Sequence, residues 1–331
     1  MKVLLTGGAG FIGSAVAYAC LDRGIDVVVL DDLSTGRDGV PPGASMYVGD
    51  IADGAVIDRI VADHPEIAVV IHCAAKTIVA ESMSDPLDYY ATNVGKTALM
   101  LEALRTRGIQ RVVFSSSASI YRADDGSGLD EDAPLLPSSP YAASKMIGER
   151  MLADASHAGQ TRALALRYFN PIGSDPLLRT GLRDEAPTHV VGRLIHAWEV
   201  GETFTITGVD WPTSDGSGVR DFVHVWDLAL AHVRAIEVFD EVVTAAMPFR
   251  ALNIGVGVPM TVRQLTGIFD RVVGGGMEVR EGARRPGDVA GGYAAVDRAR
   301  DLLGWSATRT VEEGIRDALA WRRLLMSGAR P

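Results

Sequence analysis

The sequence is short of cysteine, of long apolar runs and of clustered basic residues, and each shortage argues against a class of protein. Its 331 residues include two cysteines, Cys20 and Cys73, and no Cys-x-x-Cys pair, so neither a disulfide framework nor a structural metal site is expected. No apolar stretch reaches the roughly 18 residues that a membrane span needs. Lys and Arg number 32 against 42 Asp and Glu and form no basic block, which argues against nucleic acid and anionic membranes as partners. The start of the chain resembles a strand and not a signal peptide. Both cysteines fall in apolar segments and are expected to be reduced packing residues, so cytoplasm is the expected compartment.

What the sequence does contain is an alternation of short apolar runs and helical patterns. Such alternation predicts an α/β fold of the Rossmann type, in which helices cover both faces of a doubly wound parallel sheet. The expected strands are 2–6, 26–30, 67–72, 111–116, 162–167 and 251–253, and the expected helices are 13–23, 52–63, 86–107, 141–158, 190–200, 226–239, 262–272, 297–303 and 311–325.

The composition changes after Asn170. Residues 171–223 are rich in Pro, Gly, Asp and Thr and contain one expected helix. We therefore expect residues 1–170 plus about 224–254 to form a dinucleotide-binding domain. Residues 171–223 plus about 255–331 would form a smaller mixed α/β lobe that binds the substrate.

A glycine-rich segment lies between the first expected strand and the first expected helix. It consists of Gly7 and the motif Gly8-x-Gly10-x-x-Gly13. Glycines at these positions allow a tight turn and let a pyrophosphate approach the backbone at the helix start, near Gly10, Phe11 and Ile12. A plain tight turn is the alternative interpretation, but the strand–turn–helix context favours a dinucleotide site.

Three further segments follow expected strands and complete this cofactor site. Asp31 ends the second strand 18 residues after Gly13, where a carboxylate accepts from both ribose hydroxyls and favours NAD over NADP. Asp50 and Ile51 follow a further short strand, expected between 26–30 and 67–72 as the third of the chain, and are placed to receive the adenine edge. Cys73-Ala74-Ala75 ends the fourth strand with small residues, which would let a flat dinucleotide lie close; simple packing explains that last stretch equally well.

Tyr141 and Lys145 are four residues apart and therefore lie on one face of a helix. An ammonium beside a phenol favours the phenolate and would lower the pKa of Tyr141, making it a proton acceptor near neutral pH. Ser117, at the end of the fifth strand, would hydrogen-bond a substrate hydroxyl. Strand ends of open α/β sheets face the ligand crevice, so these residues together suggest hydride transfer at an alcohol carbon.

With these motifs in this order, the sequence resembles the extended short-chain dehydrogenase/reductase superfamily and, within it, the UDP-glucose 4-epimerases. The likeness runs over nearly the whole chain. The matching segments are Gly7–Gly13, Gly49–Ile51, Glu81-Ser82, Tyr89, Asn93-Val94, Phe114–Ala118, Tyr121, Ser139–Tyr141, Arg167–Pro171, Asp210–Val225 and Arg284–Asp288.

The resemblance implies a 4-epimerisation without net redox change. Tyr141 would take the sugar O4 proton while hydride leaves C4 for a tightly held NAD, and hydride would return to the other face of the 4-keto sugar. Ser117 would orient O4, and Lys145 would hold the nicotinamide ribose. The resemblance also implies cofactor contacts from Asn93, Ser115 and Tyr168, UDP contacts from Asn170, Arg220, Arg285 and Asp288, and a homodimer.

The sequence departs from the family pattern at several expected substrate contacts. Thr77 replaces a common Lys, although Lys76 is adjacent, and Thr207 replaces an aromatic that stacks on uracil. His189 and Val190 stand where Asn begins the family's contact segment, and Arg193 follows what looks like a one-residue insertion.

Two positions bear on which sugar is bound. Gly292 replaces a bulky gate residue and suggests a roomier pocket, and Arg193 would suit the C6 carboxylate of UDP-glucuronic acid. UDP-glucose/UDP-galactose and UDP-glucuronic/UDP-galacturonic acid are therefore both expected substrates, while a solvated role for Arg193 is equally open.

Three rival functions share the fold. A nucleotide-sugar 4,6-dehydratase would carry an Asp-Glu pair after the catalytic Ser, where this chain has Ala118-Ser119. A simple dehydrogenase would accumulate NADH. A dinucleotide-sensing regulator would tend to lose the Tyr-x-x-x-Lys pair, which is present here.

Overall fold

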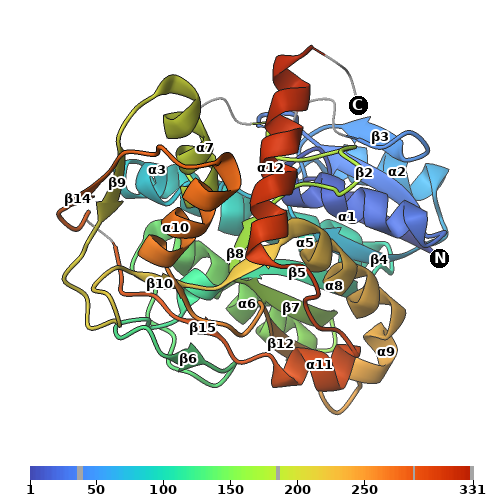
Figure 1. Cartoon of the computed structure of the whole chain (residues 1–331). Coiled ribbons are helices and arrows are strands. Elements are labelled where there is room, and N and C mark those ends of the chain that lie inside the picture. Colours follow the sequence, from blue (N-terminus) through green and yellow to red (C-terminus); the bar gives the residue numbers. More distant parts are fainter. Residues whose placement is uncertain (36–39, 184–186, 286–287, 329–331) are drawn as a thin grey trace.

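Seven parallel strands form the central sheet of the computed structural model, which describes residues 1–35, 40–183, 187–285 and 288–328 (Figure 1). The strand order is β12-β7-β5-β4-β1-β2-β3, so the chain begins in the middle of the sheet and winds out to both edges. The sheet strands are β1 (Lys2–Thr6), β2 (Asp26–Asp31), β3 (Ser45–Val48), β4 (Ile67–His72), β5 (Arg111–Ser117), β7 (Arg162–Tyr168) and β12 (Phe249–Ile254). This arrangement confirms the predicted fold class.

Alternate residues of each strand face opposite layers of helices, and this alternation accounts for the buried apolar runs. On one face Val3 and Leu5 pack with helices α1 (Phe11–Asp22) and α8 (Val225–Glu237). On the other face Leu4 packs with α2 (Gly54–Asp63) and α5 (Thr97–Thr106). Val3, Leu4 and Leu5 are all fully buried.

Helix α6 (Pro140–His157) packs on the same face as α2 and α5, against β5 and β7. It begins with Pro140 in the first turn and with Ser139 as its N-cap, whose side chain accepts from the Ala142 N–H. These signals place Tyr141 and Lys145 in the first turns of α6, close to the sheet.

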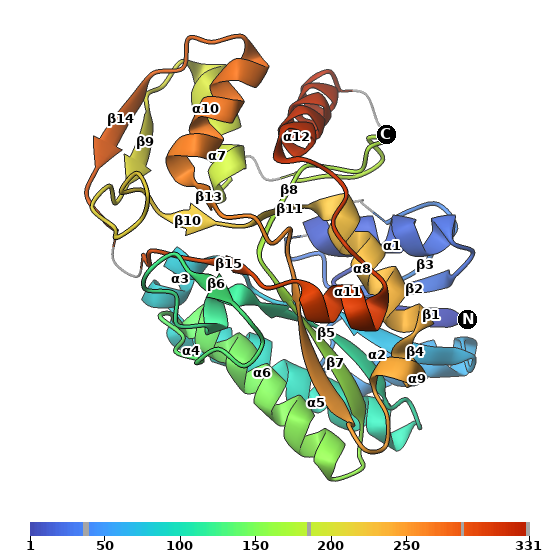
Figure 2. The same ribbon diagram turned by 60° about the horizontal axis from the view of Figure 1, so that its bottom comes forward.

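A second apolar cluster belongs to helices and strands outside the central sheet (Figure 2). It joins α7 (Val190–Val200), α10 (Val262–Val273), α12 (Val311–Met326) and β9 (Phe204–Thr207). The remaining short strands are β6 (Gly128–Leu129), β8 (Asn170–Ile172), β10 (Val219–Arg220), β11 (Phe222–His224), β13 (Met260–Thr261), β14 (Val279–Gly282) and β15 (Tyr293–Ala294), and the remaining helices are α3 (Val79–Ser84), α4 (Pro86–Tyr90), α9 (Phe239–Val242) and α11 (Asp297–Leu303).

The predicted domain division stays a prediction, and the packing adds one fact about it. Ala299 and Leu303 of α11, with Trp305 after it, pack in the apolar cluster beside α8 and the sheet, although their sequence positions lie in the predicted lobe. Within the described residues, no helix has the length and apolar character needed to cross a membrane.

The predicted helix 86–107 is interrupted. It consists of α4, a π-helical segment Ala91–Lys96 and α5. π-Helical turns are rare and are often found at functional sites. Asn93 lies within this one.

Candidate active site

The glycine segment makes a turn that no other residue fits. Gly7 has a φ of 72°, and a Cβ added there would lie 2.5 Å from the Ala74 nitrogen. A Cβ on Gly13 would lie 2.1 Å from the Gly7 oxygen. The turn is therefore pressed against the residues after β4, and Gly10 leads into α1 without a side-chain cap. The first-turn amides, which include those of Phe11 and Ile12, have no partner within the helix and suit a pyrophosphate.

Asp31 is buried at the end of β2 and is bonded to the glycine turn. Its Oδ2 accepts from the Ala9 N–H and its Oδ1 from the Leu33 N–H, both at 2.9 Å. Each carboxylate oxygen has a second lone pair, so the group keeps the capacity to accept from ribose hydroxyls.

Asp50 and Ile51 lie after β3, as predicted, but they differ in environment. Asp50 accepts from Lys96 Nζ at 2.6 Å and from the Ala52 N–H at 2.9 Å. Burial raises the pKa of Asp50, yet these hydrogen bonds outweigh it, so the net shift is downward and the carboxylate stays ionised. Ile51 is buried in the apolar cluster beside α2.

Asn93 is a buried crosslink between the segment after β4 and helix α6. Its Oδ1 accepts from the Lys76 N–H at 2.8 Å, and its Nδ2 donates to the Lys76 carbonyl and to Ser144 Oγ, both at 3.0 Å. Thr77 is exposed, and Lys76 Nζ pairs with Asp88 and with Glu81. The predicted cofactor residues Cys73, Ala74 and Ala75 are half-buried beside this crosslink.

The three predicted catalytic residues meet where β5 ends and α6 begins. Ser117 is the last residue of β5 and hydrogen-bonds the Tyr141 phenol, which lowers the pKa of Tyr141. Lys145 is 4% exposed; its Nζ donates to the Ser115 carbonyl at 2.8 Å and lies 5.1 Å from the centre of the Phe114 ring. Burial lowers the pKa of Lys145 to about 8.

The expected lowering of the Tyr141 pKa by Lys145 is wrong for this structure. Burial is the largest influence on Tyr141 and raises its pKa, and the Ser117 hydrogen bond offsets part of that rise. The Lys145 ammonium is bonded to β5 backbone instead. What favours the phenolate here is Ser117, together with the positive end of helix α6.

A buried hydrogen-bond chain lies behind these residues. Tyr168 ends β7, and its hydroxyl bonds Ser115 Oγ at 2.7 Å and His232 Nε2. Because His232 Nδ1 bonds the Leu228 carbonyl at 2.9 Å, it must carry the proton, so the Tyr168 hydroxyl donates to Nε2. Burial lowers the pKa of His232 to about 4, so this histidine is neutral. The predicted cofactor residues Ser115 and Tyr168 are thus fixed by a histidine that the sequence analysis did not select.

Three of the residues expected to hold UDP, Arg220, Arg285 and Asp288, lie close enough together to act on one another's charge. Arg220 donates to the Val219 carbonyl at 2.7 Å and to the Ala290 carbonyl at 3.1 Å. Burial lowers the pKa of Arg220, and the nearby Asp288 carboxylate opposes this. Arg285 Nε pairs with Asp288 Oδ2 at 3.1 Å. Asn170 begins β8, whose partner β11 follows β10 and Arg220 directly.

The sequence from Pro286 to Gly287, between Arg285 and Asp288, lies outside the described residues. Two guanidinium groups lie near one carboxylate, which suits recognition of a diphosphate.

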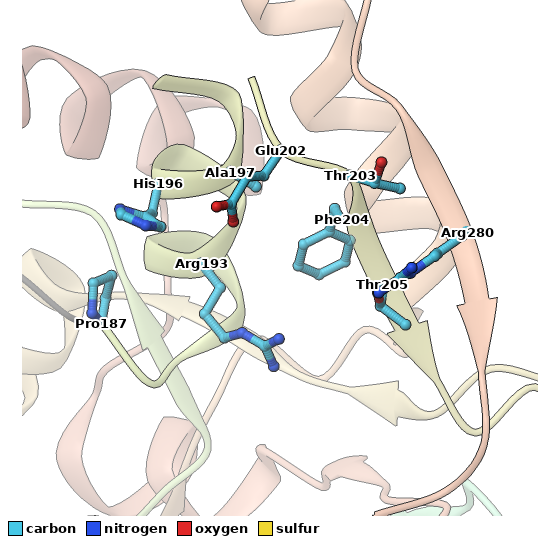
Figure 3. A pocket seen from close by; sticks show the side chains of 9 residues that line it. All are labelled: Pro187, Arg193, His196, Ala197, Glu202, Thr203, Phe204, Thr205 and Arg280. Carbon is cyan, nitrogen blue, oxygen red and sulfur yellow. The ribbon is translucent and has the colours of Figure 1, made fainter. Parts of the chain in front are cut away.

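Helix α7 carries the remaining predicted substrate residues. His189 is its N-cap and lies 6.3 Å from Phe11, ring centre to ring centre, so the start of α7 faces the start of α1. Val190 is half-buried in the first turn. Arg193 lies 5.9 Å from the Phe204 ring centre and lines a cavity of about 410 Å³ between α7 and β9 (Figure 3). Thr207 ends β9 and is half-buried.

The sequence also matches the NAD dependent epimerase/dehydratase family over residues 3–255. The chain belongs to this family. A UDP-glucose 4-epimerase of Azospirillum brasilense is 40% identical over 98% of this chain and 92% of that protein, and one of Bacillus subtilis (strain 168) is 37% identical over 99% and 98%. The UDP-glucose 4-epimerase structure from Stenotrophomonas maltophila, with bound NAD and formylated UDP-arabinopyranose, has a TM-score of 0.93 at 32% identity and covers 99% of this chain and 100% of that chain. Membership confirms the predicted NAD dependence.

The sequence suggests that Gly292 leaves room in the sugar pocket of this family member. In the structure, however, the space beside Gly292 is already filled. A Cβ on Gly292 would lie 2.7 Å from the Ser127 carbonyl oxygen and 2.8 Å from Leu129 Cδ1. The glycine is buried, and the segment Ser127–Leu129 occupies the space beside it. Its smallness therefore serves close packing.

Sequence reasoning also missed a buried ion pair beside the end of β5, next to Ser117. Glu149 and Arg167, both 5% exposed, form a two-pronged ion pair, and Ser116 Oγ donates to Glu149. The signal that would have found the pair is a Glu on the sheet-facing side of α6, eight residues after Tyr141, opposite an Arg inside an apolar strand.

Proposed function

We propose that this chain is an NAD-dependent UDP-sugar 4-epimerase that interconverts UDP-glucose and UDP-galactose. The observation that carries the proposal is that Ser117, Tyr141 and Lys145 come together at the carboxyl ends of the sheet strands, where the glycine turn and Asp31 also lie. Relatives named UDP-glucose 4-epimerase, at 40% and 37% identity over almost the whole chain, support the choice of substrate.

The cofactor fits the residues present. Among the described residues, an added Cβ at Gly10 would come within 4 Å of the Gly7 oxygen alone, at 3.4 Å, so the backbone there is open to a ligand, and Asp31 keeps unused lone pairs. Bound NAD supplies the site that accepts hydride from C4 and gives it back. Phe11 and Ile12 would offer amides to the pyrophosphate, and Asp31 would accept from the ribose.

The protein side chains divide the remaining work. Ser117 would hydrogen-bond O4 and Tyr141 would take its proton, so that C4 becomes a ketone carbon. Arg220 and Arg285 would hold the diphosphate while the keto sugar turns. Tyr141 would then return the proton to O4 on the inverted alcohol, so that no net oxidation results.

Tyr141→Phe tests this mechanism. Removal of a general base costs about 10²–10⁴ in rate, so turnover of UDP-galactose should fall by that factor while NAD stays bound. Tyr47→Phe is the matched control, since the hydrogen bond that the Tyr47 hydroxyl makes among the described residues is to surface-exposed Asp63. Turnover by Tyr141→Phe above a tenth of wild type would contradict the role of Tyr141. Stoichiometric NADH accumulation with wild type would indicate a dehydrogenase.

We further propose a homodimer formed through helices beside α6. Helices α3 and α4 and the π-helical segment all contact α6. Helices α3 and α4 expose the large apolar side chains of Met83 (49% exposed) and Leu87 (78%), and Leu99 of α5, which follows the π-helical segment directly, is 58% exposed. Such side chains are costly to leave in water and suit a self-complementary interface. Leu99→Glu should convert the dimer to a monomer in light scattering at micromolar protein concentration, and an unchanged mass would argue against this face.

A further inference from the structure

Residues 173–183, which follow β8, form a tight loop that we call the clasp loop. Ser174 and Gly181 pair in an antiparallel bridge at its base. Asp175 is fully buried, and its N–H bonds the Thr180 carbonyl at 2.9 Å. Leu178 has a φ of 54°, a conformation that is costly for a residue with a branched side chain. A loop that keeps such a residue is held by its surroundings.

Arg179 attaches the clasp loop to helix α1, which begins at the glycine turn. Its two terminal nitrogens donate to the two carboxylate oxygens of Asp22, both at 2.8 Å, and its Nε donates to Asp175. Its guanidinium carbon lies 4.6 Å from the Tyr18 ring centre and 5.3 Å from that of Trp226. A planar fork that also stacks on aromatic rings is a role that Lys cannot fill.

The contacts of the clasp loop run along α1 from its first turn to its last residue. Ser14, in the first turn, bonds Thr180 with an Oγ–Oγ1 distance of 2.5 Å, and both residues are buried. Asp22 is the last residue of the helix. On the opposite side, Ser174 Oγ donates to the Asp317 carbonyl of α12 at 2.9 Å. The loop therefore connects the helix that begins with the glycine turn to a helix of the second apolar cluster.

We propose that Arg179 is a positioning residue that fixes the clasp loop along α1 and thereby slows the release of NAD. The inference rests on the proposed function, because it takes the first turn of α1 as the pyrophosphate site. The clasp loop bonds that turn through Thr180, and His189, six residues beyond the loop, contacts Phe11 in the same turn. Movement of the clasp loop away from α1 would therefore break the contacts of Arg179 with Asp22 and Tyr18. A 4-epimerase needs the same NAD molecule to give back the hydride that it accepted, so slow release serves the reaction.

The test compares the release of bound NAD from purified holoenzymes. Unlabelled NAD on the protein is exchanged against excess radiolabelled NAD, and bound label is followed with time. Arg179→Met keeps the length of the side chain and removes its charge, so we expect release to be about tenfold faster or more, with Asp22→Asn giving a similar change. In the double variant the second change should add little.

Arg150→Met is the matched control, because the Arg150–Asp154 pair is exposed on α6, away from α1. Its release rate should equal that of wild type. Arg179→Lys serves if Arg179→Met does not fold, and it should fall between Arg179→Met and wild type. Release from Arg179→Met or Arg179→Lys within twofold of wild type, or an equal acceleration by Arg150→Met, would overturn the proposal. Failure of the wild type to epimerise UDP-galactose would count against the proposed function alone, since NAD exchange is measured without sugar.

Discussion

The ion pair between Glu149 and Arg167 allows a sharp test of how this fold is stabilised beneath its active site. Glu149 projects from α6 and Arg167 from β7, and each side chain is 6% exposed. Arg167 Nε donates to Glu149 Oε1 at 2.9 Å and its second nitrogen donates to Oε2 at 2.7 Å. Arg167 also donates to the Tyr121 hydroxyl at 2.7 Å and to the Glu131 carbonyl at 2.8 Å. Every acceptor here has been taken out of water.

Glu149→Ala leaves the Arg167 guanidinium buried without its counter-charge. Breaking a buried pair from one side costs about 3–5 kcal/mol, because the desolvation of the remaining charge is no longer compensated. Loss of packed methylenes adds to this figure, while water that enters the cavity reduces it. We therefore expect the free energy of unfolding to fall by about 3–5 kcal/mol. The double variant Glu149→Leu/Arg167→Met should recover most of the loss, since neither charge is then stranded.

The neighbouring pair between Arg150 and Asp154 is the control. It belongs to the same helix and has N–O distances of 2.9 and 3.0 Å, but its side chains are 77% and 62% exposed. Asp154→Ala should cost less than about 0.5 kcal/mol. Urea denaturation followed by circular dichroism measures all the variants. A loss below about 1 kcal/mol for Glu149→Ala, or a double variant no better than the single one, would refute the reasoning.

Three further predictions follow from individual residues. Burial puts the pKa of Lys145 at about 8, below its unfolded value near 10.5. Between these two pH values the native state binds fewer protons than the unfolded state, so stability rises with pH. In urea denaturation between pH 7 and 9.5, NAD-free wild type should therefore gain about 2 kcal/mol relative to Lys145→Met, and a difference that does not change with pH would contradict this. Gly292→Ala should lower stability by about 1–3 kcal/mol in the same assay, because its Cβ meets the Ser127 oxygen at 2.7 Å, whereas Gly54→Ala, whose Cβ would have no described atom within 4 Å, should not. If Arg193 binds a C6 carboxylate, Arg193→Ala should lower kcat/KM for UDP-glucuronate at least about tenfold and leave UDP-glucose unchanged; equal effects would exclude that role.

The fold could be predicted largely because its strands are buried on both faces. Val3, Leu4 and Leu5 are apolar in succession, and such runs between helical patterns are typical of a parallel sheet. The π-helical segment around Asn93 could not be predicted, since its extra residue per turn satisfies a contact with the Lys76 backbone that is distant in sequence. Strands of two to four residues, such as β10 and β15, likewise depend on partners that no local pattern specifies.

The candidate site divides in the same way. Residues that terminate strands, such as Asp31, Ser117 and Tyr168, could be placed because the carboxyl ends of parallel strands share one edge. His232 could not, because its role depends on a tautomer fixed by Leu228 within α8 and on a strand that is adjacent only in space. Arg179 was missed for a similar reason. Its partners Asp22 and Tyr18 are more than 150 positions away, so an isolated Arg in a loop gives no local signal.

Strand β5 explains why Tyr-x-x-x-Lys becomes a site in this chain although the pattern is common by chance. Ser115 and Ser117, two residues apart on β5, contact one member of the pair each: the Ser115 carbonyl accepts from Lys145, and the Ser117 hydroxyl bonds Tyr141. The helix spacing aligns the phenol and the ammonium on one face, but the strand decides where each is held. Because Lys145 is buried and tied to backbone and Tyr141 is half-buried, the acidity of Tyr141 depends on what β5 and the start of α6 present to it. A Tyr-x-x-x-Lys helix without serines at the end of a preceding buried strand should therefore be discounted as evidence for this chemistry.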